Sequence, residues 1–356
     1  MKKFFKAILI IVLIVVIVAV GYFAYIMLSY SRIDDNLAIT PQGSAAKTTL
    51  KTGESYTIVT QNLGFGAYVQ DYTFFMDGGK ESWARSKESV NDCITAGALT
   101  AKGYNPDFVF FQEVDFDSTR SYHIDESKII LKQFEDYAYT TAVNYHSAFL
   151  MYPLTKPHGA SKSEIMTLSR YAVTAGVRRS LPISTGFSKF LDLDRCYSKS
   201  RVAVQGGKEL VLYNVHLSAY GGSDEIRSAQ MTMLFNDMKE EYEAGNYCVC
   251  GGDFNHDFTG TSTQDLNGGG AVDFGWAQPF PADLLPSCIT RCTNYADGKL
   301  LPTCRNCDVP YKEGNFTIIV DGFLVTANVT CERVENYYTA FTYSDHCPVI
   351  MKFSLN

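Results

Sequence analysis

The sequence is poor in proline, in positive charge and in long apolar runs beyond its first 30 residues. Its 356 residues contain only 11 Pro against 23 Tyr and 23 Phe, a balance typical of a large buried core of strands rather than a disordered chain. The formal net charge of −7 argues against a general nucleic-acid binder, which is usually basic, although a local basic patch would still allow one. Because no internal repeat and no second domain boundary is evident, we expect one large domain.

The only long apolar run covers residues 7–28, and lysines precede it. A helix of that length measures roughly 33 Å, which is enough to span the hydrocarbon core of a bilayer. The lysines before the run and Asp34-Asp35 after it place the N-terminus in the cytoplasm and the body outside the cell membrane, as a single-pass protein. The alternative is a cleaved signal peptide, but its apolar region would normally be shorter and lead to a small-residue cleavage site. We therefore expect residues 1–31 to form a cytoplasmic stub and a transmembrane anchor.

Two further regions follow the anchor. Residues 32–53 are polar and rich in small residues, which is typical of a tether. In residues 54–356, short strands such as 107–111 alternate with amphipathic stretches of helical spacing such as 83–102. This alternation predicts an α/β catalytic domain, with two packed sheets and helices on their outer faces. The loop at 258–314 is unusually long, and loops of that length are often functional.

Ten cysteines raise the question of disulfides. Four of them form a C-x3-C-x11-C-x2-C cluster in the long loop: Cys288, Cys292, Cys304 and Cys307. This spacing suits a structural zinc site, a pair of disulfides that pins the loop, or free thiols. The expected location outside the cell favours disulfides over zinc.

Polar side chains able to bind metal or move protons follow apolar strands at several points. They are Asn62, Glu113, His216, Asp253, Asn255, Asp321, Asp345 and His346. Each alone would more often be a turn residue or a hydrogen-bonded core residue. Together they offer what phosphoester hydrolysis needs: a cation site, a group that activates water and a proton donor. Since Mg²⁺ prefers oxygen ligands and keeps several waters, one or two carboxylates and an amide are enough to hold it.

Three short runs carry a family resemblance: FQEV around Glu113, GGDFN around Asp253 and SDHCP around His346. In this order they resemble the endonuclease/exonuclease/phosphatase superfamily, metal-dependent phosphoesterases that include deoxyribonuclease and neutral sphingomyelinase lineages. The resemblance covers roughly residues 55–356. It implies a four-layer α/β sandwich of two mixed sheets, with Mg²⁺ or Mn²⁺ as cofactor.

The resemblance also implies which residues bind the metal. Glu113 would be the principal ligand, and Asn62 would help to hold the metal and orient Glu113. Asp345 would lie near the same ion.

Catalytic roles follow from the same comparison. Asp253 would polarise the attacking water, and Asn255 would hydrogen-bond the scissile phosphate. His216 would contact the phosphate or assist the leaving group. His346 would stabilise the pentacovalent phosphate or act as an acid, while Asp321 orients it and raises its basicity.

Substrate contacts are less constrained by the sequence. Residues 170–201 are rich in Arg and Lys, which would attract phosphate polyanions, although a solvated loop is the simpler interpretation. We expect substrate contacts from Arg201, Arg305, Asn306 and His146.

Three functions fit these features. The favoured one is a membrane-anchored extracellular Mg²⁺-dependent phosphoesterase that acts on a lipid headgroup or a small phosphate. The second is a surface nuclease that cleaves DNA or RNA, and the third is a non-catalytic binding domain. The expected partners are the phosphoester substrate and the membrane, with no obligate protein partner.

Overall fold

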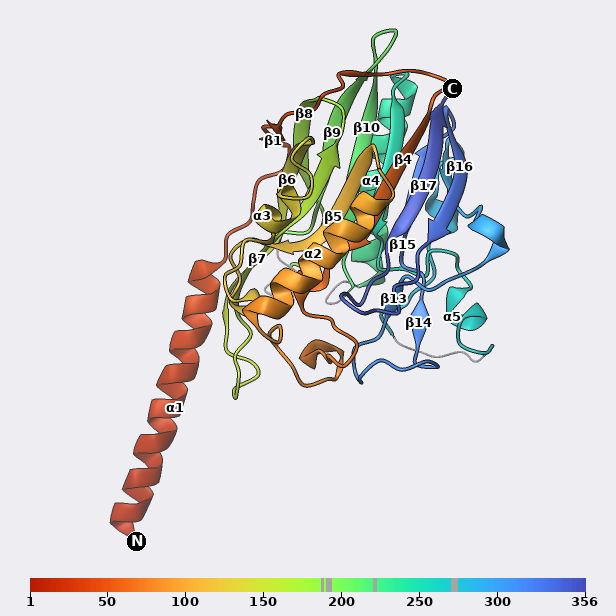
Figure 1. The fold of residues 1–356 in the computed structure, drawn as a ribbon. Coiled ribbons are helices and arrows are strands. Elements are labelled where there is room, and N and C mark those ends of the chain that lie inside the picture. The colour runs from red at the N-terminus through yellow and green to blue at the C-terminus, as the bar shows by residue number, and fades with distance from the viewer. Residues whose placement is uncertain (187–188, 190–193, 220–222, 270–274) are drawn as a thin grey trace.

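The computed structural model describes residues 1–186, 189, 194–219, 223–269 and 275–356. Two mixed sheets face each other, and helices cover their outer faces, so the predicted four-layer α/β sandwich is confirmed (Figure 1). Helix α1 (Lys2–Ser29) projects away from this sandwich. It is the one helix among the described residues that is long and apolar enough to cross a membrane, a test that a signal sequence also passes.

The first sheet has seven strands within the described residues, in the order β16-β17-β4-β5-β7-β6-β2. The strands are β2 (Gln42–Gly43), β4 (Ser55–Asn62), β5 (Phe108–Asp115), β6 (Ala138–Leu150), β7 (Gly159–Ser169), β16 (Val329–Asn336) and β17 (Val349–Leu355). Helices α2 (Lys87–Gly103) and α3 (Glu126–Leu131) pack on this sheet. Because β4 and β5 run parallel, with Asn62 opposite Gln112, their carboxyl ends lie together.

Helix α2 follows the sequence pattern closely. Val90, Ile94 and Ala98 form its buried face, as their spacing predicts. The helix begins at Lys87 rather than near Trp83, because the Ser86 side chain caps it by accepting a hydrogen bond from the Ser89 amide.

The second sheet has eight strands within the described residues, in the order β1-β8-β9-β10-β11-β15-β12, with β3 also paired to β9. The strands are β1 (Leu37–Ile39), β3 (Thr49–Leu50), β8 (Val173–Ser180), β9 (Cys196–Val204), β10 (Lys208–His216), β11 (Tyr247–Asp253), β12 (Ile289–Arg291) and β15 (Asp321–Thr326). Helix α4 (Asp224–Glu243) covers its outer face with Met231, Leu234 and Met238. Strands β10 and β11 are parallel and place His216 opposite Asp253.

The long loop that the sequence predicts contains short elements of its own. These are α5 (Ser262–Asp265), β12 and β13 (Cys304–Arg305), which pairs with β14 (Thr317–Ile318). The β13–β14 pair lies beside the carboxyl ends of the main strands. The backbone of Cys304 also forms an isolated antiparallel β-bridge with the backbone of His346. The loop therefore delivers residues to the same edge that the parallel strands reach.

Residues 32–53 differ from the expected tether. They lie along the domain, and β1, β2 and β3 extend both sheets. The Ile33 amide donates to Asp194, and Asp35 accepts hydrogen bonds from the Arg179 side chain and the Ser180 amide. These contacts hold the end of α1 against the domain instead of leaving it on a free linker.

Of the three alternatives for the cysteines, the structure has free thiols and not the favoured disulfides. All ten are free thiols. The four in the long loop pack in four different apolar clusters, so they form neither the predicted zinc site nor the predicted disulfides. Burial in separate parts of the core explains this, because a thiol behaves there as a small apolar side chain. Cys292 lies instead beside Cys331, far along the sequence.

The core between the sheets is mostly apolar, but some buried polar side chains hydrogen-bond across it, among them Thr140 with Ser200 at 2.7 Å. Phe108, Phe110 and Phe323 are among its fully buried side chains. Asn214, on β10, accepts a hydrogen bond from Gln112 of the facing sheet at 2.8 Å and donates to the Met166 carbonyl at 2.9 Å. This pair ties the two sheets together close to their carboxyl ends.

We predict that Asn214→Ala lowers the free energy of unfolding by about 2 kcal/mol, because the buried Gln112 amide, which also donates to Thr60, loses an acceptor and the Met166 carbonyl loses a donor. Chemical denaturation of the full chain in detergent micelles would measure it. The control is Asn91→Ala on the exposed side of α2, which should change stability by less than about 0.5 kcal/mol. Equal effects of the two substitutions would contradict the tie between the sheets.

Candidate active site

A pocket lies where the carboxyl ends of the parallel strands of both sheets meet, an edge we call the seam. The predicted residues that line it are Glu113, His216, Asp253, Asn255, Arg305, Asn306, Asp345 and His346. Asn62 and Asp321 lie behind the pocket wall, where they contact Asp253 and His346, and both are almost completely buried. The fold thus gathers at one place residues from position 62 to position 346 of the chain.

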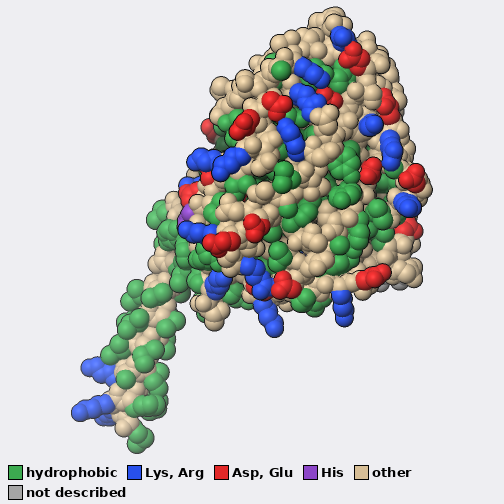
Figure 2. All heavy atoms as spheres, viewed as in Figure 1, with side chains coloured by type: hydrophobic (Ala, Val, Ile, Leu, Met, Phe, Trp, Pro, Cys, Tyr) green, Lys and Arg blue, Asp and Glu red, His purple; other side chains and the backbone are tan. Residues whose placement is uncertain are grey.

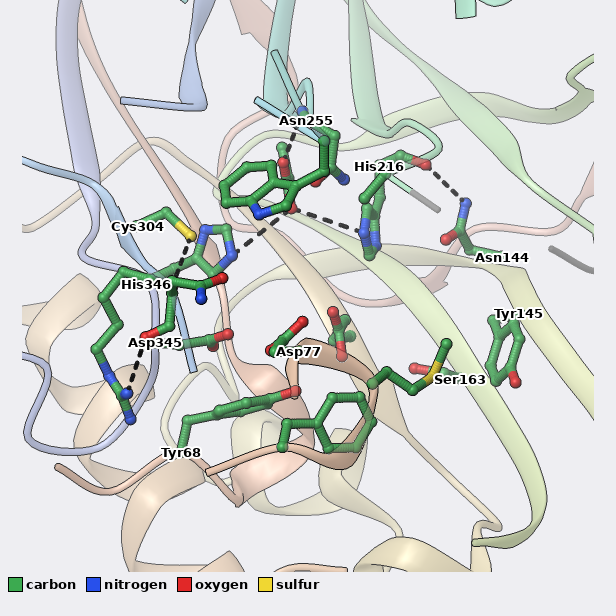
Figure 3. Close-up of a pocket in the computed structure, with 18 of the residues that line it drawn as sticks. Tyr68, Asp77, Asn144, Tyr145, Ser163, His216, Asn255, Cys304, Asp345 and His346 are labelled. Carbon is green, nitrogen blue, oxygen red and sulfur yellow. Dashed lines mark hydrogen bonds and ion pairs between the residues drawn. The ribbon is translucent and has the colours of Figure 1, made fainter. Parts of the chain in front are cut away.

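The imidazoles of His216 and His346 flank the carboxylate of Asp253, and Figure 3 shows the two rings in the pocket. His216 Nε2 lies 3.6 Å from Asp253 Oδ2, and His346 Nε2 lies 3.7 Å from the same oxygen. On its other side, His346 Nδ1 is 2.8 Å from Asp321 Oδ2. This contact fixes the orientation of the His346 ring and leaves Nε2 facing the pocket.

The two imidazoles have opposite pKa shifts. Burial and the nearby cations Arg195 and His346 lower the pKa of His216 well below its ordinary value. Burial also opposes the charged form of His346, but Asp321 is the largest of the opposing influences that together raise its pKa well above the ordinary value. Burial raises the pKa of Asp253 to about 7. These opposite shifts favour the neutral form of His216 and the charged form of His346, a division that acid–base chemistry uses.

Backbone geometry aims the groups at the pocket. Glu113 has a φ of +52° and lies at a register shift in the pairing of β5 with β7, so a bulge turns its side chain out of the regular alternation. Asn255 has a φ of +50°, its amide donates to Asp253, and its side chain donates to the Leu217 carbonyl at 2.8 Å. Such left-handed conformations are uncommon outside glycine, and their clustering here marks a functional edge.

Comparison with known proteins identifies the site. The family model described as "Endonuclease/Exonuclease/phosphatase family" matches residues 59–346, which include every member of the pocket named above. The chain belongs to the endonuclease/exonuclease/phosphatase family. A search of curated proteins found no match.

Solved structures with the same fold confirm the architecture at low sequence identity. The endonuclease/exonuclease/phosphatase from Beutenbergia cavernae DSM 12333 matches with a TM-score of 0.56 and 16% identity over 85% of this chain and 72% of that chain. The family protein from Leptotrichia buccalis C-1013-b matches with a TM-score of 0.52 and 14% identity, over 84% and 100%. D. rerio TDP2, solved with a single-strand DNA product, matches with a TM-score of 0.52 and 14% identity, over 85% and 99%.

The family consists of metal-dependent phosphoesterases and nucleases, and the donor set here fits a hard cation. Glu113 and Asp345 both line the pocket. Burial raises the pKa of Asp345 to about 6, and the carboxylate of Glu113 contributes to the rise. A divalent cation held by both acids would relieve this repulsion, and oxygen donors are the ligands that Mg²⁺ prefers. Asn62 donates to Glu113 at 3.3 Å and to Asp253 at 3.1 Å, so it positions both acids.

Arg120 is a site residue that the sequence did not indicate. It lines the pocket, makes two hydrogen bonds of 2.9 Å to Asp115, and lies 3.8 Å from Glu113. Its guanidinium group also covers the ring of Phe65, 3.8 Å from the centroid. Arg120 therefore holds Glu113 from the side opposite Asn62. Arg120 lies in a turn after β5, outside the strand and its motif, so only the fold reveals it.

The predicted substrate contacts divide into two groups. Arg305 and Asn306 line the pocket, although Arg305 is buried and donates to the carbonyls of Val69 and Tyr72. Arg201 and His146 do not line it. Arg201 forms ion pairs with Glu209 and Glu241, and His146 pairs with the buried Asp194, so their placement argues against contact with substrate.

The cations of the basic stretch at 170–201 divide: Arg195 lines the pocket, whereas others form ion pairs away from it. Arg179 pairs with Asp35 and Asp237, and Lys199 pairs with Asp237 and Glu241. Residues 187–188 and 190–193 lie outside the described residues. Acids from α4 and from the N-terminal segment thus neutralise Arg179 and Lys199, which the sequence suggested could attract a phosphate polyanion.

Aromatic and apolar side chains form part of the pocket wall. They are Tyr68, Phe74, Met76 and Trp276, and the first three come from the segment between β4 and α2. His158, from the segment that leads into β7, lines it too. Its Nδ1 contacts the Ser82 carbonyl at 2.9 Å, which requires a proton on Nδ1 and leaves Nε2 as an acceptor.

A pH dependence of stability follows from His158. Burial lowers its pKa from 6.5 to about 4, so between these values the unfolded chain binds a proton that the folded chain does not. Stability from this group is therefore present above pH 6.5 and is lost as pH falls toward 4. We predict that His158→Gln removes about 2 kcal/mol of the stability loss between pH 7 and pH 5. Denaturant titrations at both pH values would test it; an equal loss in parent and variant would contradict it.

Proposed function

We propose that this chain is a membrane-anchored, Mg²⁺-dependent phosphoesterase whose catalytic domain faces the outside of the cell. The observation that carries the proposal is the pair of imidazoles with opposite pKa shifts on either side of Asp253, next to the acids Glu113 and Asp345. Membership of a family of metal-dependent phosphoesterases and nucleases supports the reaction class.

In this proposal each residue has a defined task. Glu113 and Asp345 hold the cation, with Asn62 and Arg120 as positioning residues. What the bound cation supplies is positive charge on the phosphoryl oxygens. Asp253 lies between the imidazoles, where it would accept a hydrogen bond from the attacking water.

The remaining groups handle protons and the phosphoryl group. Charged His346, oriented by Asp321, would stabilise the developing negative charge or give a proton to the leaving oxygen. Neutral His216 and Asn255 would contact the phosphoryl group from the other side. The buried charges make the third alternative, a non-catalytic binding domain, a poor account, because burying unused ionisable groups costs stability.

A lipid headgroup or small phosphate is the substrate class that we favour. Arg179, Lys199 and Arg201 of the stretch at 170–201 pair with acids of the domain, whereas Arg195 lines the pocket, whose wall combines acids with aromatic side chains. One arginine among several acids and aromatic rings suits a compact phosphate group better than a long polyanion. Cleavage of DNA or RNA is the second candidate, because D. rerio TDP2 was solved with a single-strand DNA product and shares this fold.

Removal of divalent metal should abolish turnover of the substrate, and Mg²⁺ or Mn²⁺ should restore it. We would test duplex DNA, RNA, phospholipids and aryl phosphodiesters with the full chain in vesicles, before and after EDTA. Asp253→Ala is the control and should be inactive with metal present. Full activity without divalent metal would refute the mechanism, and turnover of nucleic acid alone would favour the nuclease.

Replacing His346 with Ala should lower kcat by on the order of 10²-fold, since it removes the group that stabilises charge or donates the proton. Steady-state kinetics on whichever substrate the parent chain turns over would measure it. A drop in thermal stability with unchanged kcat would instead assign His346 a structural role.

A further inference from the structure

The hairpin that joins β6 to β7 carries an exposed apolar tip. Phe149, Met151, Tyr152 and Leu154 are 40%, 41%, 67% and 81% exposed. Single exposed apolar side chains are common on soluble proteins, but four within six residues form a patch that water alone does not explain.

The same tip contacts α1. The Tyr22 hydroxyl accepts a hydrogen bond from the Met151 amide at 2.9 Å and donates to the Phe149 carbonyl at 3.2 Å. The Tyr25 hydroxyl accepts from the Phe149 amide at 3.1 Å. These contacts cap free backbone groups at the hairpin, which matters in an environment that lacks water.

An apolar groove continues these contacts along the helix. Ile14, Val18 and Tyr22 of α1 face Met151, Tyr152 and Leu154 across it. Ile14 and Tyr22 are eight positions apart, so the groove covers about 12 Å of the helix axis. Figure 1 shows the hairpin descending beside α1, and Figure 2 shows hydrophobic side chains gathered where the helix meets the domain.

The contacts between α1 and the hairpin indicate how deep the hairpin lies in the bilayer. If residues 7–28 span the bilayer, Tyr22 and Tyr25 lie near its outer interface, where tyrosine is enriched. Leu154 lines the same groove as Ile14 and Val18, which lie closer to the cytoplasmic end than Tyr22, so the tip of the hairpin then falls within the outer leaflet. We propose that the β6–β7 hairpin inserts into the outer leaflet beside α1 and that the substrate is a phospholipid headgroup of the same leaflet.

The hairpin also reaches the active site, which links membrane insertion to substrate. The ring of Tyr152 lies 5.7 Å from that of Phe75, and Phe75 lies 5.4 Å from His158, which lines the pocket. Trp83 fixes the returning strand by donating to the Pro157 carbonyl at 2.7 Å. One wall of the pocket and the inserted tip therefore belong to one packed unit, which brings the pocket to the headgroup layer. The substrate assignment rests on the proposed function, whereas the insertion does not.

Depth-dependent quenching tests the insertion directly. The full chain, one copy per lipid nanodisc, would carry Leu154→Trp, with Thr330→Trp on the exposed side of β16 as the matched control. The fluorescence of the two native tryptophans is first subtracted. Lipids brominated along their acyl chains should then strongly quench the fluorescence of the tryptophan introduced in the hairpin. They should hardly quench that of the tryptophan introduced in β16. Equal quenching of the two variants would overturn the insertion. The insertion would also be overturned if the hairpin indole were buried only in nanodiscs that hold two copies of the chain. In that case the tip would contact a second chain instead of the lipid.

A second experiment tests the substrate. Met151→Ser combined with Leu154→Ser should lower turnover of phospholipid in vesicles at least 10-fold and leave turnover of a soluble aryl phosphodiester unchanged. Leu37→Ser, at an exposed apolar position of β1, should change neither. Equal rates of parent and double variant on vesicles would overturn the substrate assignment. Failure of the parent chain on both substrates would refute the proposed function, and the quenching result would still decide the insertion.

Discussion

The hydrogen bond from Asn62 to Asp253 joins the two sheets at the point where the acids and imidazoles of the site converge. Asn62 ends β4 of one sheet, and Asp253 ends β11 of the other. A second donation from Asn62 to Glu113 connects the cation-binding side of the pocket to the same point. The geometry of the site therefore depends on how closely the two sheets approach at the seam.

Close approach imposes its own requirements on the chain. Gly252 precedes Asp253 with a φ of +143°, and an added Cβ would lie 2.0 Å from the Val215 carbonyl oxygen, so only glycine fits there. The cost of gathering charges in a buried place is offset by mutual contacts. Asp321 stabilises charged His346, and Arg120 stabilises Asp115. For Asp345, burial outweighs the nearby His346 and Arg305 and raises its pKa to about 6, so a cation beside this acid would stabilise its charged form.

Much of the fold and most of the candidate site could be predicted from the sequence, because both depend on local patterns. Apolar strands that end in a polar residue marked Asn62, Glu113, His216 and Asp253, and parallel pairing then had to bring these ends together. The helical spacing at 83–102 marked helix α2, which occupies Lys87–Gly103. The family resemblance added the order of the motifs, which composition alone does not carry.

The rest depends on contacts between distant segments, which no local pattern reports. Arg120 is defined by Asp115 and Phe65, and Arg201 is removed from the site by Glu241. The cysteine spacing suggested one cluster, whereas packing distributes the thiols among separate parts of the core. Residues 32–53 have the composition of a linker, yet backbone pairing to both sheets orders them.

The central claim is that Glu113 and Asp345 form a single divalent-cation site at the seam. Titration of the full chain with Mn²⁺, followed by electron paramagnetic resonance of the free ion, tests it most directly. The account predicts one bound ion per chain and an affinity at least 10-fold weaker in Glu113→Gln, while Glu54→Gln, an exposed acid elsewhere, binds as the parent does. Equal affinity in Glu113→Gln and the parent chain would contradict it.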